Sequence, residues 1–478
     1  MKQSISIRLF AGLFGVAALL FAVNAQAAST SVADASNAEA TAQEEQNVPE
    51  EAKAALEDFR AGRFEDAVKK LDEARKKNPD MAPAHLVLAQ WFGLANQPRA
   101  VRQAIEQAVT LNPDDPEAFV VLGELNLQNG GFTEAELLFA RAESMLESFS
   151  GSDLRKSNIR KRVLLGNAQV KIARNKKDEA EKALNMVLEL DAANLDALNL
   201  LGALYFNEDK IDECLATYEK VKTAQPNTLL PEARVAMMYQ QKGDEDSKKK
   251  AAEYMVSAIK KAPKDGDVRM VATQWSLQVG NIKQAAAQAE AALTLKKDDK
   301  NLADAQLLRG VVALFEKDYL KAEEMFQKVL EASPSNFAAS NNLALALCEQ
   351  GENDPEKLRK AEEYAVVNVR QYQNQPEAFS TAAWVTYKKG DYPTAAQLLQ
   401  KSIELSNGQL NPDTAYYLAA TLVKIQTNDA KQAEDNKNRA KEILSKTLEN
   451  TTPFSMRPEA EELLKTLGGA DAPAAPAK

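Results

Sequence analysis

The sequence predicts an all-α protein built from stacked pairs of helices. Two observations support this prediction. The dipeptides Asn78-Pro79 and Asn112-Pro113 lie 34 residues apart, and each precedes an apolar, helix-forming segment. The stretch "LNPDDPEAFVVLGELNLQNGGFTEAELLFARA", from Leu111 to Ala142, reads as two helices joined by a glycine turn. A helix pair that returns at a fixed period is typical of a solenoid, in which neighbouring pairs bury each other's apolar faces.

A small residue in the second helix of each pair gives the number of repeats. It returns at steps of 34 residues or of 34 plus a short insertion, which predicts about eleven repeats between residues 48 and 457. The positions are Ala67, Val101, Ala135, Ala180, Cys214, Ala251, Ala285, Ala322, Ala361, Ala395 and Ala440.

Three further residue types return at equivalent positions of the repeats, and each has a physical reason. A small residue in the first helix, such as Gly123, Gly166, Gly202 or Gly310, lets the two helices cross closely. A proline after the second helix, such as Pro79 or Pro113, prevents that helix from continuing. Glycines mark the turn inside the pair, at Gly130, Gly243, Gly280, Gly351 and Gly390.

With these columns in register, the chain resembles the tetratricopeptide-repeat family over roughly residues 48–452. The resemblance implies an α-solenoid that winds as a right-handed superhelix. Four of the five departures from the 34-residue period are polar insertions, which we expect to be solvated extensions of turns. They are "ESFSGSDLRKSN", "GDEDSKKK", "GENDPEKLRK" and "QTNDAKQAEDNKN".

The first 27 residues have the layout of a secretory signal peptide. Lys2 and Arg8 form a positive start, the run from Leu9 to Val23 is apolar, and Ala25-Gln26-Ala27 supplies small residues for cleavage. A retained N-terminal anchor is the alternative. Cleavage would predict a periplasmic or secreted protein, and would change the formal net charge from −10 to −12.

The remaining boundaries follow from composition. Residues 28–47 contain almost no large apolar side chains and are predicted to be a disordered linker. After the solenoid at 48–457, residues 458–467 could form a polar capping helix, and "GGADAPAAPAK" at 468–478 is predicted to be a disordered tail.

Charge and residue usage disfavour several functions. A net charge of −10 with a pI near 5.1 repels nucleic-acid phosphates and anionic lipid. His85 is the only histidine, so a multi-histidine metal site is excluded. Cys214 and Cys348 are four repeats apart, too far for a disulfide within the chain, and Cys348 is expected to be the more accessible thiol. We find no catalytic constellation and no phosphate loop, and we expect neither enzymatic activity nor a cofactor.

The resemblance also implies which side chains a partner would contact. In this family the first helices line a concave groove, and five positions of each repeat point into it. Transferred to this chain, the columns give an apolar, amide-rich middle and a second patch near Trp384 and Tyr387, with Tyr416 beyond them. The lysines with which some members bind acidic tails are missing here. The predicted protein-binding residues are Asn199, Phe206, Met237, Gln240, Met270, Gln274, Leu277, Leu307, Val311, Phe315, Trp384 and Tyr387.

These features predict an exported scaffold that binds segments of other proteins, in cell-envelope assembly, secretion or export. Two alternatives stay open. The chain could be an accessory or regulatory subunit of an envelope enzyme complex, or a membrane-tethered assembly factor if the signal segment is retained. Part of the predicted groove could also be internal packing of a tightly wound superhelix.

Overall fold

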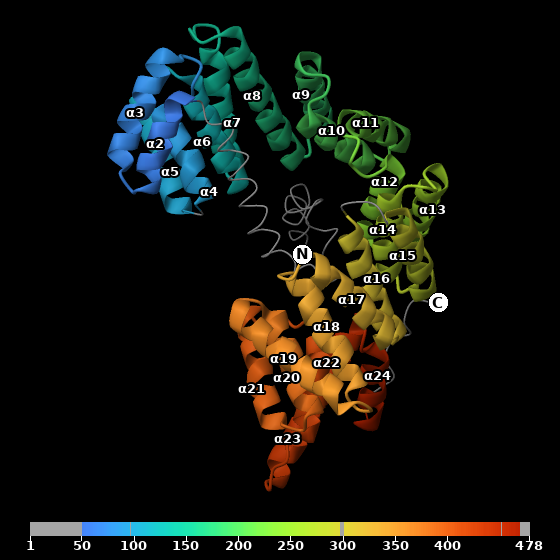
Figure 1. Ribbon diagram of the computed structural model, residues 1–478. Coiled ribbons are helices and arrows are strands. Elements are labelled where there is room, and N and C mark those ends of the chain that lie inside the picture. The colour runs from blue at the N-terminus through green and yellow to red at the C-terminus, as the bar shows by residue number, and fades with distance from the viewer. Residues whose placement is uncertain (1–49, 96, 297–300, 451, 469–478) are drawn as a thin grey trace. The chain divides into compact units, whose positions relative to one another are not determined.

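The computed structural model describes residues 50–95, 97–296, 301–450 and 452–468, and in these residues the chain is entirely α-helical apart from its turns. The predicted signal peptide, the predicted linker and nearly all of the predicted tail lie outside the described residues. Helices α2 to α23 form eleven successive pairs, as the repeat spacing predicts, and one further helix follows (Figure 1). No helix in these ranges is both long and apolar enough to cross a bilayer.

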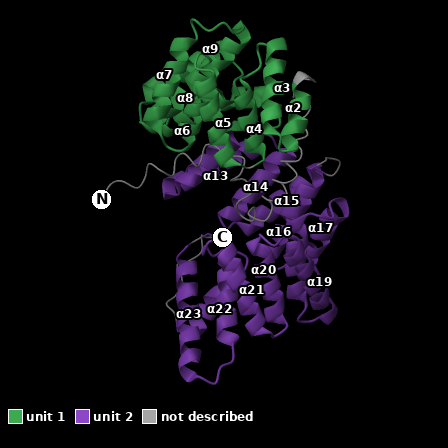
Figure 2. Cartoon of the chain, turned by 90° about the vertical axis from the view of Figure 1, so that its left-hand side faces the viewer, with its two compact units in different colours: residues 1–13, 33–231 green, residues 14–32, 232–478 purple. Residues whose placement is uncertain are grey.

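The chain divides into two compact units near Pro231, where the sequence predicts one continuous solenoid (Figure 2). In unit 1 the helices are α2 (Glu50–Arg60), α3 (Phe64–Lys77), α4 (Ala84–Leu94), α5 (Pro98–Leu111), α6 (Pro116–Gln128), α7 (Phe132–Met145), α8 (Asp153–Ala173), α9 (Lys177–Leu190), α10 (Leu195–Asn207) and α11 (Ile211–Ala224).

Unit 2 continues the same alternation of first and second helices. Its helices are α12 (Pro231–Lys242), α13 (Glu245–Lys261), α14 (Gly266–Gln278), α15 (Ile282–Lys296), α16 (Leu302–Glu316), α17 (Tyr319–Ala332), α18 (Phe337–Gln350), α19 (Pro355–Gln371), α20 (Pro376–Lys388), α21 (Tyr392–Leu405), α22 (Pro412–Lys424), α23 (Ala430–Glu449) and α24 (Arg457–Thr466).

In unit 2 the even-numbered first helices α14, α16, α18, α20 and α22 form a continuous layer. Each of them packs on its second helix; the first four also touch the first helix of the next repeat, and α22 touches α24. No pair of consecutive second helices in the described part of the unit shows comparable contact. A stack curves toward the side on which its helices approach each other more closely. We therefore call the exposed side of these five first helices the inner face of unit 2.

The small-residue columns are confirmed at the helix crossings. A methyl carbon added at Gly166 would lie 2.3 Å from a ring carbon of Phe139, and one added at Gly123 would lie 2.7 Å from the same ring. Gly310 meets Phe326 in the same way, at 2.5 Å. The second-helix column is fully buried except at Val101, which is half-buried. One aromatic ring thus fills the space that two glycines leave open.

The turn glycines are confirmed with one exception. Gly130 has φ +77° and Gly390 has φ +87°, in the left-handed region that costs glycine nothing. Gly351 is instead right-handed, with φ −65°. In the corresponding turn of the α16–α17 pair stands Lys317, with φ +61°. A non-glycine residue there costs about 1 kcal/mol, so the surroundings of Lys317 must hold it in place.

The prediction that the insertions extend turns is wrong for three of the four. "GDEDSKKK" leaves only its first two residues outside α13, and the insertions before α19 and α23 likewise lie mostly within those helices. The first insertion is divided, because residues 147–152 do extend the turn before α8 and the rest of it opens that helix. The reason is local, because each insertion joins good helix formers to a capping residue. Asp244 accepts a hydrogen bond from the Ser247 backbone N–H, and Asp354 and Asp429 cap α19 and α23 in the same way.

A final helix follows the last pair at the position where the sequence indicates a cap. This helix, α24, packs on α23 and α22. Its apolar side and the residues just before it join the largest core of unit 2, where they are buried. The buried residues are Phe454, Met456, Ala460 and Leu464.

Candidate protein-binding surface

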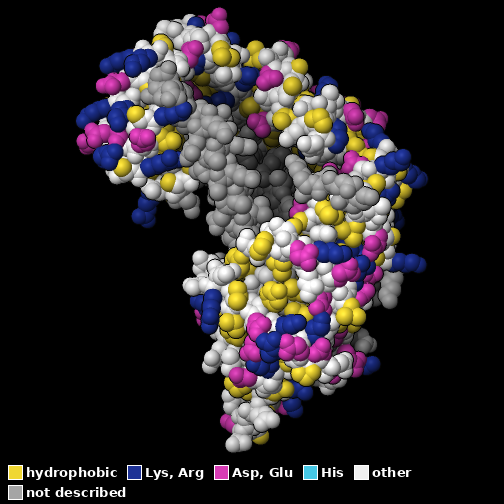
Figure 3. Space-filling model, in the orientation of Figure 1, with side chains coloured by type: hydrophobic (Ala, Val, Ile, Leu, Met, Phe, Trp, Pro, Cys, Tyr) yellow, Lys and Arg dark blue, Asp and Glu magenta, His cyan; other side chains and the backbone are white. Residues whose placement is uncertain are grey.

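The inner face of unit 2 carries large apolar side chains that are only half-buried. Leu307 and Phe315 lie on α16, Leu345 on α18, Tyr387 on α20 and Tyr416 on α22. All five pack against the core of the unit while keeping part of their surface in solvent. Hydrophobic side chains also gather in Figure 3 on the part of unit 2 around α17 and α18.

The twelve predicted binding residues fall into two groups by burial. Asn199 and Phe206 belong to unit 1 and the other ten to unit 2. Four are nearly inaccessible: Phe206 (3% exposed), Leu277 (2%), Val311 (8%) and Trp384 (3%). These four have little surface to offer a partner. The half-buried ones are Asn199, Met237, Gln240, Met270, Gln274, Leu307, Phe315 and Tyr387. That any of the twelve contacts a partner stays a prediction.

Trp384 acts as a structural link between three first helices. Its indole Nε1–H donates to Glu349 Oε1 on α18 at 2.5 Å. Its ring is stacked on Tyr387 of its own helix, with centroids 4.6 Å apart, and on Tyr417 of α22, at 4.4 Å. Tyr416 adds a tilted contact at 5.6 Å. We call Trp384, Tyr387, Tyr416 and Tyr417 the aromatic patch. Trp384 and Tyr417 are buried, so only Tyr387 and Tyr416 expose part of the patch to solvent.

Charged groups border the aromatic patch. Glu349 Oε2 accepts a hydrogen bond from Lys388 Nζ at 2.9 Å, and this ammonium also lies 5.2 Å from the centre of the Trp384 ring. Burial raises the pKa of the Tyr387 hydroxyl above its ordinary value. Burial likewise raises the pKa of Tyr416, and the nearby carboxylates of Glu459 and Glu349 add to the effect. Both phenols therefore stay neutral at physiological pH.

The structure brings residues to this surface that the sequence columns do not contain. Lys317 Nζ donates to the Ser455 carbonyl at 2.8 Å and pairs with Glu459 Oε1 at 2.9 Å. Asp413 Oδ1 accepts from Ser455 Oγ at 2.9 Å and from the Met456 backbone N–H at 3.0 Å. The segment that begins α24 is thereby fixed to both α16 and α22. The only sequence signal is a lysine where several other repeats have a turn glycine.

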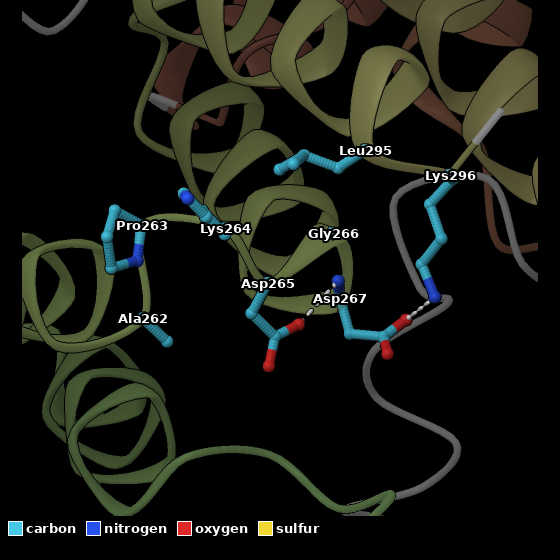
Figure 4. Close-up of a pocket in the computed structure, with 8 residues that line it drawn as sticks. All are labelled: Ala262, Pro263, Lys264, Asp265, Gly266, Asp267, Leu295 and Lys296. Carbon is cyan, nitrogen blue, oxygen red and sulfur yellow. Dashed lines mark hydrogen bonds and ion pairs between the residues drawn. The ribbon is translucent and has the colours of Figure 1, made fainter.

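An open pocket of about 550 Å³ lies elsewhere in unit 2, between α13, α14 and α15 (Figure 4). Three of its charged side chains are already paired. Asp265 caps α14 by accepting from the backbone N–H groups of Asp267 and Val268, and Lys296 Nζ lies 2.8 Å from Asp267 Oδ1. We therefore do not choose this pocket as the site.

Reactive side chains in the described part of the chain are sparse and mostly buried. Burial raises the pKa of the Cys214 thiol to about 12. Cys348 was expected to be accessible, but it is 1% exposed, because its side of α18 faces the core. His85 is half-buried, and burial lowers its pKa. No group of three His, Cys, Asp or Glu residues in the described ranges is arranged to hold a metal ion.

Comparisons with known proteins match this architecture. A family model described as "Tetratricopeptide repeat" matches residues 52–92, 95–152, 276–336 and 307–354, and a second model of that description matches residues 195–228. No curated protein sequence matches the chain.

Three solved structures are among those similar to it. A tetratricopeptide repeat protein from Parabacteroides merdae is 15% identical, with a TM-score of 0.36, over 65% of this chain and 99% of that one. PilW, described as a type IV pilus biogenesis factor, is 18% identical, with a TM-score of 0.37, over 49% and 96%. Yeast Tom70 is 14% identical, with a TM-score of 0.35, over 87% and 94%.

Proposed function

Because the chain belongs to the tetratricopeptide-repeat family, whose members serve as protein-interaction scaffolds, we propose that it is an exported, non-enzymatic scaffold. Its inner face in unit 2 would hold a segment of a partner protein. The family supports the scaffold role, and the leader-like first 27 residues support export to the periplasm or beyond.

The observation that carries the proposal is the row of half-buried apolar side chains on the inner face. Met270, Leu307, Phe315, Leu345 and Tyr387 come from α14, α16, α18 and α20, so the row runs across consecutive repeats. Removing the rest of their apolar surface from water is worth about 25 cal/mol per Å². An extended segment or an amphipathic helix that lies across several repeats could bury these side chains and gain this free energy.

One of these half-buried side chains, Tyr387, is also fixed in place. Tyr387 is stacked on Trp384, which is itself held by Glu349. A partner that binds Tyr387 therefore orders little that was not ordered before, and so loses little conformational entropy. Rigid aromatic anchors of this kind contribute most of the binding free energy in many interfaces.

A replacement of three inner-face residues tests the scaffold role. The variant Met270→Ser, Leu307→Ser and Phe315→Ser should abolish partner capture from a photo-crosslinking amino acid at Tyr387. Helicity measured by circular dichroism should be unchanged, because the three side chains are only half-buried.

The matched control carries the same number of serines on second helices. Val256, Val366 and Val367 are exposed on α13 and α19, at 40%, 41% and 44%. The triple serine variant at these positions should capture partners as the unchanged protein does. Equal capture by both triple variants would contradict the placement of the binding surface on the inner face.

Export is tested by the mass of the mature protein. Loss of residues 1–27 after expression with a bacterial secretion system would support release into the periplasm. An intact N-terminus on a membrane-bound protein would favour the tethered assembly factor instead. Activity that appears only in a purified complex would favour the accessory-subunit alternative.

A further inference from the structure

The segment that begins α24 connects two first helices that are three repeats apart. Lys317 directly follows α16, and its Nζ donates to the Ser455 carbonyl at 2.8 Å and pairs with Glu459 Oε1 at 2.9 Å. Asp413, in the first turn of α22, accepts from Ser455 Oγ at 2.9 Å and from the Met456 backbone N–H at 3.0 Å. Ser455 therefore contacts the end of one first helix with its backbone and the start of another with its side chain.

Residues 454–466, which we call the strap, are held differently at their two attachments. Arg457 is 5% exposed and donates to two backbone carbonyls at the end of α23, at 2.8 and 3.4 Å. At α16 the strap is held by the Lys317 ammonium, and the side chains of Lys317 and Glu459 are 31% and 40% exposed. An ion pair that keeps this much contact with water contributes little to stability. The base of the strap is therefore fixed to α23, whereas this ion pair holds it to α16 only weakly.

Lys317 adopts a backbone conformation that its residue type disfavours. In the described part of the chain, the non-glycine residues with positive φ are Asn175 (+58°), Asp209 (+59°), Lys317 (+61°) and Asn407 (+52°). Asparagine and aspartate tolerate the left-handed region because their short polar side chains can form local hydrogen bonds, which a lysine does not do. The contact with the strap, and not the turn itself, therefore explains a lysine at this position.

The strap meets α22 on the side of this helix that belongs to the inner face. Tyr416 lies three residues after Asp413, so the two side chains leave α22 on the same side, about one turn apart. Tyr416 is half-buried and is one of the two tyrosines that expose part of the aromatic patch to solvent. A partner segment that covers Tyr416 and continues toward the start of α22 would therefore meet the strap.

We propose that the strap is an autoinhibitory contact, which occupies the inner face between the end of α16 and the start of α22 until a partner segment displaces it. The proposal rests on the proposed scaffold function and adds its regulation. An element that changes between two states needs a small free-energy difference between them. The disfavoured backbone of Lys317 and its exposed ion pair with Glu459 both keep this difference small. Because Arg457 stays on α23, a released strap remains close to its site and can return.

Hydrogen exchange of the full-length protein tests whether Lys317 holds the strap. Lys317→Gly removes the ammonium and relieves the left-handed turn, so the α16–α17 pair should still fold. The amides of α24 should exchange about tenfold faster, as expected when a hydrogen bond to a charged group is lost, while those of α23 keep their rates. Asn175→Gly is the matched control, because it relieves a turn of the same kind in unit 1 and should leave α24 unchanged. Unchanged exchange of α24 in Lys317→Gly, or equal acceleration in both variants, overturns the proposal.

A labelled peptide of residues 452–460 tests whether the strap occupies a site that another segment can take. The receptor is the full-length protein with Met456→Ser and Glu459→Gln, which removes two contacts of its own strap with Lys317 and leaves Lys317 and Asp413 in place. Fluorescence polarisation should show that the peptide binds this variant at least about tenfold tighter than the unchanged protein, whose own strap competes. A peptide that carries the same two substitutions should bind neither. Equal binding to both proteins, or no binding to the variant at millimolar concentration, overturns the proposal.

Partner capture separates autoinhibition from a purely structural cap. Capture from a photo-crosslinking amino acid at Tyr416 should rise severalfold when Lys317→Gly is added and should not change with Asn175→Gly. If α24 exchanges faster in Lys317→Gly but capture does not rise, autoinhibition fails while the scaffold role stands. If the serine variants of the inner face leave capture from Tyr387 unchanged, the scaffold placement fails.

Discussion

A methyl group at Gly166 would overlap the buried ring of Phe139, at 2.3 Å from its nearest carbon. Gly166→Ala should therefore destabilise the protein by about 1–3 kcal/mol, the usual cost of overpacking a core. The measurement is the free energy of unfolding in urea. Because Gly123 meets the same ring from α6, the ring cannot turn away to relieve the overlap.

Gly93 provides the matched control for this change. It is exposed in α4, and the nearest atom to an added methyl carbon is Val101 Cγ2 at 4.0 Å. Gly93→Ala should stabilise by about 0.5–1 kcal/mol, because alanine loses less backbone entropy in a helix. If both variants changed the free energy of unfolding in the same direction, the close helix crossing at Gly166 would not explain the effect.

The two thiols should be unreactive in the folded protein. Burial raises the pKa of Cys214 to about 12, and burial also raises that of Cys348. At pH 8 almost no thiolate is present, and the thiolate is the reactive form. A colorimetric thiol reagent should detect neither cysteine at pH 8 and should detect both after denaturation. Rapid modification of Cys348 in the native protein would show that α18 opens locally.

At the scale of helices, Asp244 should determine where α13 begins. Its carboxylate accepts from Ser247 Oγ at 2.7 Å and from the Ser247 backbone N–H at 2.9 Å. Asp244→Ala should speed hydrogen exchange of the first-turn amides of α13 at pH 6. Asp246→Ala is the control, because Asp246 lies in the same turn, is exposed and has only a 3.8 Å contact with Lys249. Equal acceleration in both variants would exclude a capping role.

The effect of Asp244 should also depend on pH. Hydrogen bonds from the Ser247 side chain and then its backbone lower the pKa of Asp244 below the ordinary 3.8. A carboxyl group with a lowered pKa stabilises the folded state above its unfolded pKa, and the contribution is lost as pH falls through the folded value. Relative to Asp244→Ala, the protection of the first turn should therefore be lost as the pH falls below 3.8 and through the lowered pKa of Asp244. Protection that persists below that pKa would mean that the protonated side chain is sufficient.

The helices also show which local features a sequence can predict. The crossing glycines and the turn at Gly130 were predictable, because a close approach or a left-handed backbone requires a particular residue type. The length of α13 does not follow from polar composition, because turns and exposed helix surfaces are both polar. The segment after Asp244 contains helix formers behind a capping residue, and those two properties determine the outcome.

At the scale of the molecule, the binding surface was only partly predictable. Equivalent positions in the repeats predict which side chains a partner would contact, and Tyr387 and Tyr416 at such positions are half-buried on first helices of unit 2. That either one contacts a partner stays a prediction. Repeat positions cannot show that Trp384 is buried, since its burial depends on Tyr417 in the next repeat. Glu459 lies in α24, after the last repeat, so no repeat position predicts its place. It reaches the surface because α24 folds back toward Lys317, a contact between distant parts of the sequence.

In stacked repeats, a destabilising substitution should lower stability mainly in the repeat that contains it and in its neighbours. Gly310→Ala would place a methyl carbon 2.5 Å from the Phe326 ring, inside the α16–α17 pair of unit 2. In such an array stability is the sum of each repeat and its contacts with its neighbours, so protection should fall in α14 to α19 first. Hydrogen exchange with mass spectrometry can follow both units in one sample. Residues 50–231 should keep their protection, whereas Gly166→Ala should give the reverse pattern. A uniform loss over both units would mean that the eleven pairs unfold as one cooperative body, and the division near Pro231 would have no energetic meaning.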